Sequence, residues 1–230
     1  RAVIGMATAR FQDAGAPAEP TDSSEHWKPR SRSEVRAMER LEELFEERPV
    51  WLEGPLVKQL PAGLDYTTML RLLHNVAYQW ADGPWQSAFT RYGWDPRENP
   101  EEAKWLQVLE FRDPTLRSPP GSKRSIRPVS QEPTDCTFRR PPAVYKQCYQ
   151  LTDIQDGFIQ ELVESSEPLE ECTKKFGFLS EIVFDAFRER LRVRSQQLRE
   201  KRAAREEALA SKKRPSWRGS RDGRQPCKRV

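Results

Sequence analysis

The stretch that decides the fold is residues 65–92, which read DYTTMLRLLHNVAYQWADGPWQSAFTRY. Asp65 is a good N-cap, and the apolar residues after it recur at helical spacing, which predicts a helix to about Trp80. The strong turn signal Asp-Gly-Pro at 82–84 ends this pattern. From 85 to 92 the period changes to two, which predicts a strand. The inner stripe of the helix is expected to consist of Met69, Leu72, Leu73, Val76 and Trp80.

Two further helices are expected on the N-terminal side of this stretch. Ser31 and Glu34 form an S-x-x-E capping box before an apolar stripe at helical spacing. Pro49 ends that helix, because the residue before a proline resists the helical conformation. A short second helix is expected to begin at Pro55, since proline suits the first helical position.

On the C-terminal side, a second strand-like run extends from Lys104 to Phe111, after a polar loop. Two such runs around a Pro/Gly-containing loop predict a β-hairpin with a long tip. The order helix, helix, helix, hairpin over residues 31–113 predicts an α+β fold with a winged helix-turn-helix domain, in which three helices precede a β-hairpin wing. Several interaction domains share this order, so it does not by itself fix the function.

The remaining segments differ in composition. Residues 1–30 show no period and are expected to be irregular. Residues 114–142 form a Pro-rich, basic linker. Residues 143–198 are expected to form a small helical C-terminal segment that packs on the winged helix and contains a long charged helix. Residues 199–230 form a charged, basic tail, either a solvated helix or, as we favour, disordered chain.

Within the C-terminal segment, Thr152 and Gln155 form a second capping box. The helix after it is expected to bury Ile154, Phe158, Leu162 and Val163. The long helix is expected to begin near Ser180 and to turn one apolar side inward, made of Ile182, Val183, Ala186, Phe187 and Leu191.

Charge is distributed unevenly along the chain, whose net charge is +4. Residues 186–230 carry 16 Lys/Arg against 5 Asp/Glu, whereas residues 33–112 carry 9 Lys/Arg against 14 Asp/Glu. A basic tail on a mildly acidic body suggests nucleic-acid contact or nuclear import. The run Lys212, Lys213 and Arg214 is the candidate nuclear-localisation signal.

No feature of the sequence indicates an enzyme. The chain has no Gly-rich phosphate loop, no nucleophile elbow and no metal-ligand cluster, and none of its four cysteines stands in a C-x-x-C pair. We therefore expect no catalytic activity, no cofactor, no metal site and no small-molecule substrate. No run of about 18 apolar residues exists, so we expect no membrane span.

Several short motifs follow one another in a distinctive order. They include ERPVW at 47–51, VAY at 76–78, GPW at 83–85, RYGWDPR at 91–97 and QVLEFR at 107–112. Over about residues 33–112 the chain resembles the family of the TFIIIC subunit general transcription factor 3C polypeptide 5, the tau-A subunit, in its winged-helix DNA-binding region. The resemblance resumes more weakly from Tyr145 to about Arg190.

The resemblance implies a non-catalytic, nuclear role. It implies that the chain is a DNA-binding subunit of the general transcription factor TFIIIC, which helps bind the internal promoter of tRNA genes in the A-box region. The partners implied are double-stranded DNA, the other TFIIIC subunits and, indirectly, TFIIIB and RNA polymerase III. Gln86 and Glu98 depart from the family, since basic residues are expected there, and the basic tail departs from the family's acidic one.

Candidate DNA contacts follow from residue type and position. Phosphate contacts need basic side chains at the rim of a groove, and base contacts need forked donors or amides on an exposed helical face. Arg71, His74 and Asn75 qualify as base readers on the third helix. The candidates for phosphate contact are Lys58, Arg71, Arg91, Arg97, Lys104 and Arg112.

Each of these residues also has a purely structural interpretation. Arg97 has the alternative of pairing with Asp95 to shape its loop, and His74 that of lying half-buried against Tyr78. Trp94, in the same loop as Arg97, is a candidate for contact with a sugar or a partner. The whole domain has the alternative of serving as a protein-interaction scaffold within TFIIIC with little direct DNA contact.

Overall fold

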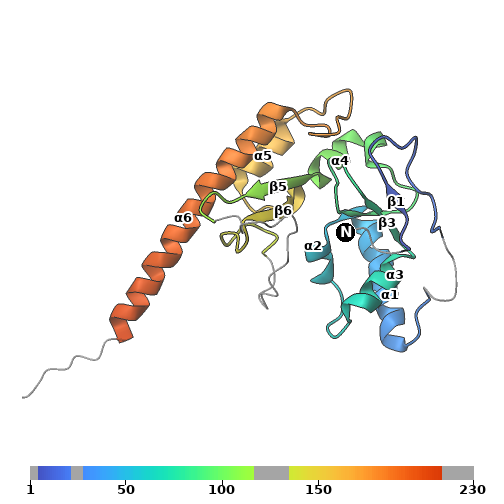
Figure 1. The fold of residues 1–230 in the computed structure, drawn as a ribbon, viewed down its shortest axis with the longest axis horizontal. Coiled ribbons are helices and arrows are strands. Elements are labelled where there is room, and N and C mark those ends of the chain that lie inside the picture. The colour runs from blue at the N-terminus through green and yellow to red at the C-terminus, as the bar shows by residue number, and fades with distance from the viewer. Residues whose placement is uncertain (1–4, 22–27, 117–134, 214–230) are drawn as a thin grey trace, which may run out of the picture.

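The computed structural model describes residues 5–21, 28–116 and 135–213. Two units lie side by side (Figure 1): an N-terminal unit with three helices and a sheet, and a C-terminal unit built on a two-stranded hairpin. One long helix crosses the C-terminal unit and projects well beyond it. Every helix in the described ranges is too short or too polar to cross a lipid bilayer.

Three helices begin the N-terminal unit: α1 (Arg32–Glu47), α2 (Glu53–Val57) and α3 (Tyr66–Leu73). The N-cap of α1 is Ser31, whose Oγ accepts a hydrogen bond from the amide of Glu34 at 3.2 Å. The Glu34 carboxylate accepts from the amide of Arg30 rather than that of Ser31, so only half of the predicted capping box forms. The inner face of α1 packs on α3 through buried Leu41, Leu44 and Phe45.

A four-stranded sheet completes this unit, in the order β1-β3-β4-β2. Its strands are β1 (Thr8–Ala9), β2 (Val50–Trp51), β3 (Ala77–Trp80) and β4 (Phe89–Arg91). β3 and β4 form an antiparallel hairpin with Tyr78 opposite Thr90, and β2 pairs antiparallel with the other edge of β4. β1 pairs with β3 in parallel. The segment predicted to be irregular at 1–30 therefore contributes one edge strand.

The third helix is shorter than the sequence pattern predicts. It ends at Leu73, and residues 77–80 form β3 instead of a further helical turn. The Asn75 amide donates to the carbonyl of Leu72 at 2.9 Å, which helps to end the helix. All four residues of β3 are buried, because the strand lies inside the sheet and its alternate side chains pack into hydrophobic clusters on both faces. Val76 and Trp80 matched the helical stripe only by coincidence of spacing.

The prediction of a hairpin between residues 85–92 and 104–111 is wrong in its strand pairing. The hairpin partner of β4 is β3, and residues 100–106 form helix α4 (Pro100–Leu106), with Pro100 at its first turn. The short 3-10 helix η2 (Pro96–Glu98) precedes it. Strand β5 (Val108–Arg112) then pairs with β6 (Lys146–Gln150), which lies far along the chain.

The C-terminal unit adds a 3-10 turn and two helices to this β5–β6 hairpin. They are η3 (Leu151–Asp153), α5 (Gly157–Ser165) and α6 (Glu181–Lys213). Their core contains Leu109, Phe111, Phe138, Tyr149 and Phe187. Phe138 belongs to the segment predicted to be linker, so the last part of that segment is folded into the core. The segment predicted to be purely helical contributes strand β6.

Three details of this unit differ from the sequence prediction. The N-cap of α5 is Asp156, not Thr152, so the helix begins later and turns Ile159 inward while Phe158 is exposed. On α6, Ile182 is 81% exposed, although it was expected to face the core. Residues 199–213 continue α6 rather than forming disordered chain, and the side chains from 201 to 211 are exposed.

Two buried glutamines join the units. The Gln150 amide nitrogen donates to the carbonyls of Val50 and Leu106, at 3.0 and 2.9 Å, and its oxygen accepts from the amide of Leu52. Gln107 accepts from the amide of Phe178 at 2.7 Å and donates to the carbonyl of Phe176. Because an unpaired buried amide costs about 1–3 kcal/mol, these bonds fix how the units sit together.

Candidate nucleic-acid interface

The start of α3 and the turn of the β3–β4 hairpin each present exposed polar side chains. Met69, Leu72 and Leu73 turn inward, whereas Tyr66 and Thr67 are exposed. At the far end of the hairpin, the turn between β3 and β4 presents Gln86 and Ser87, both exposed. Both places offer hydroxyl or amide groups, which suit phosphate and base-edge contacts but bring no positive charge of their own.

Arg71 does not lie on that face. It is only 8% exposed, and its guanidinium donates to Glu34 Oε2 and to the carbonyl of Lys28, both at 2.5 Å. The hydrogen bond from Arg71 lowers the pKa of the Glu34 carboxyl. In this position Arg71 ties α3 to the beginning of α1, so its fork of donors is already used inside the protein.

His74 and Asn75 lie where α3 ends. His74 is 1% exposed, and the hydroxyl of Tyr92 donates to its carbonyl at 3.1 Å. Asn75 is half-buried and donates to carbonyls in the last turn of α3. The prediction that His74 and Asn75 lie on an exposed reading face with Arg71 is therefore wrong in its geometry, because α3 stops before them and the chain turns into β3.

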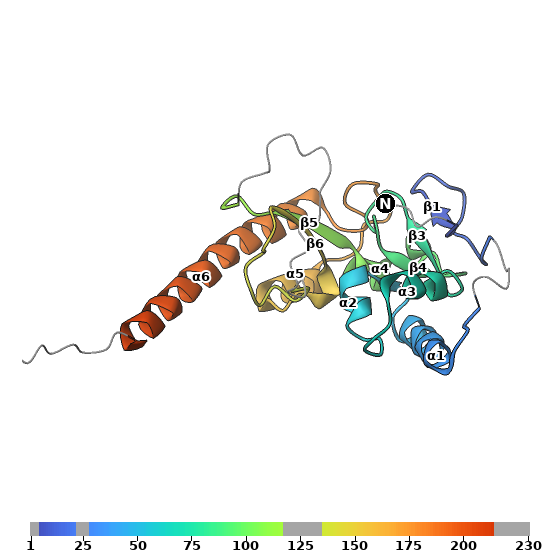
Figure 2. The ribbon, with the colours of Figure 1, turned by 60° about the horizontal axis from the view of Figure 1, so that its bottom comes forward.

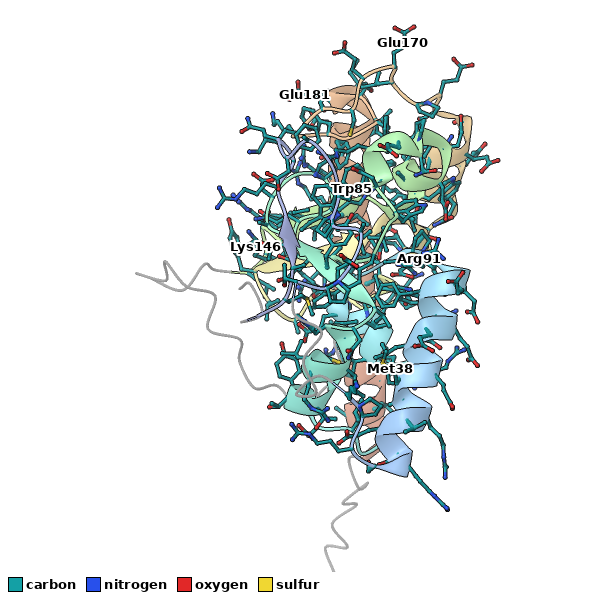
Figure 3. All side chains as sticks on the ribbon, turned by 90° about the vertical axis from the view of Figure 1, so that its right-hand side faces the viewer. Met38, Trp85, Arg91, Lys146, Glu170 and Glu181 are labelled. Atoms are coloured by element: carbon teal, nitrogen blue, oxygen red, sulfur yellow. The ribbon has the colours of Figure 1, made fainter. Side chains whose placement is uncertain are left out.

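Arg91 and Arg97 both carry internal partners. Arg91, on β4, reaches Glu46 of α1 at 2.7 Å, and Figure 3 shows it beside that helix. Arg97 pairs with Asp95, its Nη2 lying 2.6 Å from Oδ2, and also donates to the carbonyls of Phe11 and Asp13. Arg97 thus pairs with Asp95, as its structural interpretation predicts. Its other hydrogen bonds join this loop to the N-terminal segment.

The other three candidates lie apart from α3 and from one another. Lys58 is exposed at the end of α2, with its Nζ 3.6 Å from the Cys136 sulfur. Lys104 is buried on α4 and donates to the carbonyl of Ser166 at 3.0 Å. Arg112, on β5, is exposed and pairs with Glu110 at 2.8 Å. The eight candidates therefore do not converge on one surface.

Other positions that the sequence analysis noted differ in their exposure and location. Trp94 is half-buried against the core of the sheet, and its carbonyl accepts from the hydroxyl of Tyr78, whose burial raises its pKa. Glu98 is exposed on η2. Lys212 and Lys213 are the last two residues of α6, and Arg214 lies outside the described residues.

Sequence reasoning missed Tyr66 as an exposed aromatic at the start of α3, where it is 52% exposed. The sequence did contain a signal for this exposure, namely the N-cap residue Asp65. The Asp65 side chain accepts from the amide of Thr68 at 2.9 Å, as an N-cap does, and this fixes the register that turns Tyr66 outward. Gln86 was noted only as a missing charge, not as an exposed position in the hairpin turn.

The described cysteines are thiols without a disulfide partner: Cys136, Cys148 and Cys172. Burial raises the pKa of Cys136, and it raises the pKa of Cys172 to about 12, which keeps these sulfurs protonated and unreactive. Among the described residues, no group of three His, Cys, Asp or Glu side chains is arranged to hold a metal ion.

Known proteins similar to this chain include proteins with a domain of this kind. Residues 3–112 match the family model described as "Tau95: RNA polymerase III transcription factor (TF)IIIC subunit HTH domain". That range covers the sheet, α1, α2, α3, α4 and β5. A helix-turn-helix domain of an RNA polymerase III transcription factor is therefore the class of protein that the fold and the sequence define.

Individual relatives agree with the family match. General transcription factor 3C polypeptide 5 of Homo sapiens is 30% identical over 166 residues, which cover 67% of this chain and 31% of that protein. Transcription factor tau subunit sfc1 of Schizosaccharomyces pombe is 29% identical over 64% of this chain and 30% of its own length. A solved structure named Sfc1-DBD has the same fold, with a TM-score of 0.65 at 24% identity over 85% of this chain and 90% of that one.

The chain belongs to this family of TFIIIC subunits. The family consists of transcription factor subunits, so the prediction that the chain is not an enzyme is confirmed. The matched part spans less than a third of the length of the human and fission-yeast relatives.

Proposed function

We propose that this chain contacts the DNA of a TFIIIC-bound promoter through a winged helix-turn-helix domain. In this proposal α3 is the recognition helix and the β3–β4 hairpin is the wing. The observation that carries it is the topology: three helices are followed by a hairpin whose second strand, β4, also pairs with β2. The name of the solved relative, Sfc1-DBD, designates a DNA-binding domain and supports the same reading.

The DNA-facing surface in this proposal consists of the exposed start of α3 and the tip of the wing. Tyr66 and Thr67 would face a groove, and Gln86 and Ser87 would lie along the flanking backbone. Hydroxyl and amide donors at these places position a protein on phosphates without strong sequence preference. The larger role, binding the A-box region of tRNA gene promoters in the nucleus and recruiting TFIIIB and RNA polymerase III, is proposed on the family alone.

The test places negative charge on this surface. The double variant Thr67→Glu with Gln86→Glu is compared with wild type for binding of a fluorescent duplex that contains a tRNA gene promoter. Both side chains are exposed, so folding should be unchanged, while repulsion by phosphates should weaken binding about tenfold or more. The control Leu169→Glu with Ile182→Glu adds the same charge at exposed positions of the C-terminal unit.

A second function has one observation in its favour. Arg71, Arg91, Arg97 and Lys104 all engage acidic partners within the chain, and residues 33–112 contain more acidic than basic residues. Such a surface suits a scaffold that packs against other TFIIIC subunits. If the Thr67→Glu, Gln86→Glu variant binds duplex DNA as wild type does, the scaffold becomes the better account of the winged helix.

A further inference from the structure

The end of α6 projects from the protein. The helix has 33 residues, so it is about 50 Å long. Its last anchor on the body is Arg199, which donates to buried Asp113 at 2.7 Å and to the carbonyl of Pro142 at 2.8 Å. Every side chain from Lys201 to Ser211 is exposed, and Figure 2 shows this part standing clear of both units.

One face of α6 from Arg194 onward, which includes the projecting part, is basic. Arg194, Lys201 and Arg205 are spaced by seven and four residues, which places them in one row along the helix. We call this row the basic stripe. The acidic residues of this region lie more than a quarter of a turn away from it, and they are Glu189, Glu200, Glu206 and Glu207.

The basic stripe continues the face that covers the core. Phe187, Leu191 and Leu198 pack against the C-terminal unit from this side of α6. Beyond the anchor at Arg199 the same side carries Lys201 and Arg205, whose side chains are exposed. Beyond Arg199, therefore, this side of α6 carries positive charge. A helix that packed on its own chain there would carry apolar residues.

The residues of the basic stripe differ in their ion pairing from other basic residues of α6. Among the residues that the structure describes, neither Arg194, Lys201 nor Arg205 forms an ion pair. By contrast, Arg188 and Arg192, on another face of α6, pair with Asp185 and Glu189 at 2.7 and 2.5 Å. The charges of Lys201 and Arg205, whose side chains are exposed, are thus open to an external anion, whereas Arg194 is half-buried.

We propose that the basic stripe of α6 binds the phosphate backbone of duplex DNA, beside the winged helix. This rests on the proposed function. The winged helix provides the shape for a groove but holds Arg71, Arg91 and Arg97 in internal ion pairs, so additional phosphate attraction is expected from another part of the chain. From Arg194 to Arg205 the stripe spans about 16 Å, and a duplex presents one charge per about 1.7 Å of its axis.

A protein occupant fits this face less well. Helices that dock in a groove of a partner use apolar anchors at i, i+3, i+4 and i+7. Beyond Leu198, this side of α6 offers one exposed large apolar residue, Leu209, which is 51% exposed. A basic row without such anchors matches a polyanion with regularly spaced charges.

The test removes charge from the stripe and keeps the helix. Lys201→Gln with Arg205→Gln is made in the whole chain, and Arg194 is left in place because it is half-buried. The matched control, Arg188→Gln with Arg192→Gln, removes the same charge from another face. Affinity for a fluorescent 30-base-pair duplex is measured by anisotropy over a range of KCl concentrations, and helix content by circular dichroism.

The stripe variant should bind about tenfold more weakly than wild type, and its plot of log affinity against log salt should be shallower by about 2, as expected for two lost phosphate contacts. The control should keep the wild-type slope. Equal slopes for the stripe variant and wild type would overturn the stripe proposal while leaving DNA binding by the winged helix intact. If wild type itself does not bind the duplex, both proposals fail together.

Discussion

The N-terminal unit ties Arg71 and Arg97 into the fold, whereas the C-terminal unit also carries basic residues that extend beyond it. In the N-terminal unit, Arg71 and Arg97 each hold two distant segments together through a carboxylate and backbone carbonyls. In the C-terminal unit, Arg199 anchors α6, and the basic residues beyond it extend into solvent. The number of basic residues in a unit therefore says little about its ability to bind an external anion. A paired, half-buried guanidinium has already used its hydrogen-bond donors.

The largest expected effect concerns the joint between the units. Gly177 has a φ of +61°, and a Cβ there would lie 2.0 Å from Gln107 Oε1. Gly177→Ala should therefore force Gln107 out of its bonds to Phe176 and Phe178 and cost about 3 kcal/mol of unfolding free energy. Urea denaturation, followed by fluorescence and by circular dichroism, measures the loss and shows whether the units still unfold together.

Gly157→Ala is the control for this substitution. Gly157 is the first residue of α5, and apart from the adjoining backbone no heavy atom lies within 4 Å of an added Cβ. The unfolding free energy of the Gly157→Ala variant should differ from that of wild type by less than about 0.5 kcal/mol. A Gly177→Ala protein as stable as this control would show that the contact between Gln107 and the 176–178 turn does not hold the two units together.

The next effect tests whether Arg71 is structural. Arg71→Ala leaves the Glu34 carboxylate without its partner, beside the first turn of α1, and should cost about 2 kcal/mol. Arg36→Ala removes an exposed arginine from the same helix as Glu34 and should change the unfolding free energy by less than about 0.5 kcal/mol. Thermal and urea unfolding of both variants would compare them. If their stabilities are alike, the assignment of Arg71 to the fold is wrong.

The anchor of α6 should give a smaller, pH-dependent effect. Burial raises the pKa of Asp113, but hydrogen bonds from Arg199, Ser195 and Thr115 outweigh it and lower the pKa to about 2. Because this value lies below the unfolded pKa of about 3.9, the carboxylate stabilises the fold above about pH 4 and that contribution is lost as the pH falls toward 2. Asp113→Asn should cost about 1.5 kcal/mol at pH 7.

The matched control for the anchor is Asp185→Asn, which breaks an exposed pair with Arg188. It should leave the unfolding free energy almost unchanged at every pH. Acid titration followed by circular dichroism distinguishes the two variants. The difference in stability between Asp113→Asn and wild type should shrink between pH 4 and 2, and a difference independent of pH would argue against a charged Asp113 in the anchor.

The smallest effect is expected at Arg91. Its pair with Glu46 is 2.7 Å long, but the Glu46 side chain is 75% exposed, so solvent screens the interaction. Arg91→Ala should therefore cost less than about 0.5 kcal/mol. A double-mutant cycle with Glu46→Ala measures the coupling directly. A coupling above about 1 kcal/mol would place Arg91 with Arg71 among the structural arginines.

The sequence by itself determined the family and the local elements that depend on near neighbours. Ser31 and Asp65 cap α1 and α3 as expected, because a capping side chain bonds an amide only a few residues away. The ordered motifs pointed to the TFIIIC subunit family, which the comparisons confirm.

Only the tertiary structure decided how these elements pair and which charges are free. The strand at 77–80 exists because β1 and β4 supply its hydrogen-bond partners, and β5 pairs with a strand more than 30 residues further on. Helical spacing cannot reveal either pairing, because each partner strand lies well beyond the three or four residues that one helical turn connects. For the same reason the sequence could not show that Arg71 faces Glu34, or that α6 carries its basic row past the last residue that holds it.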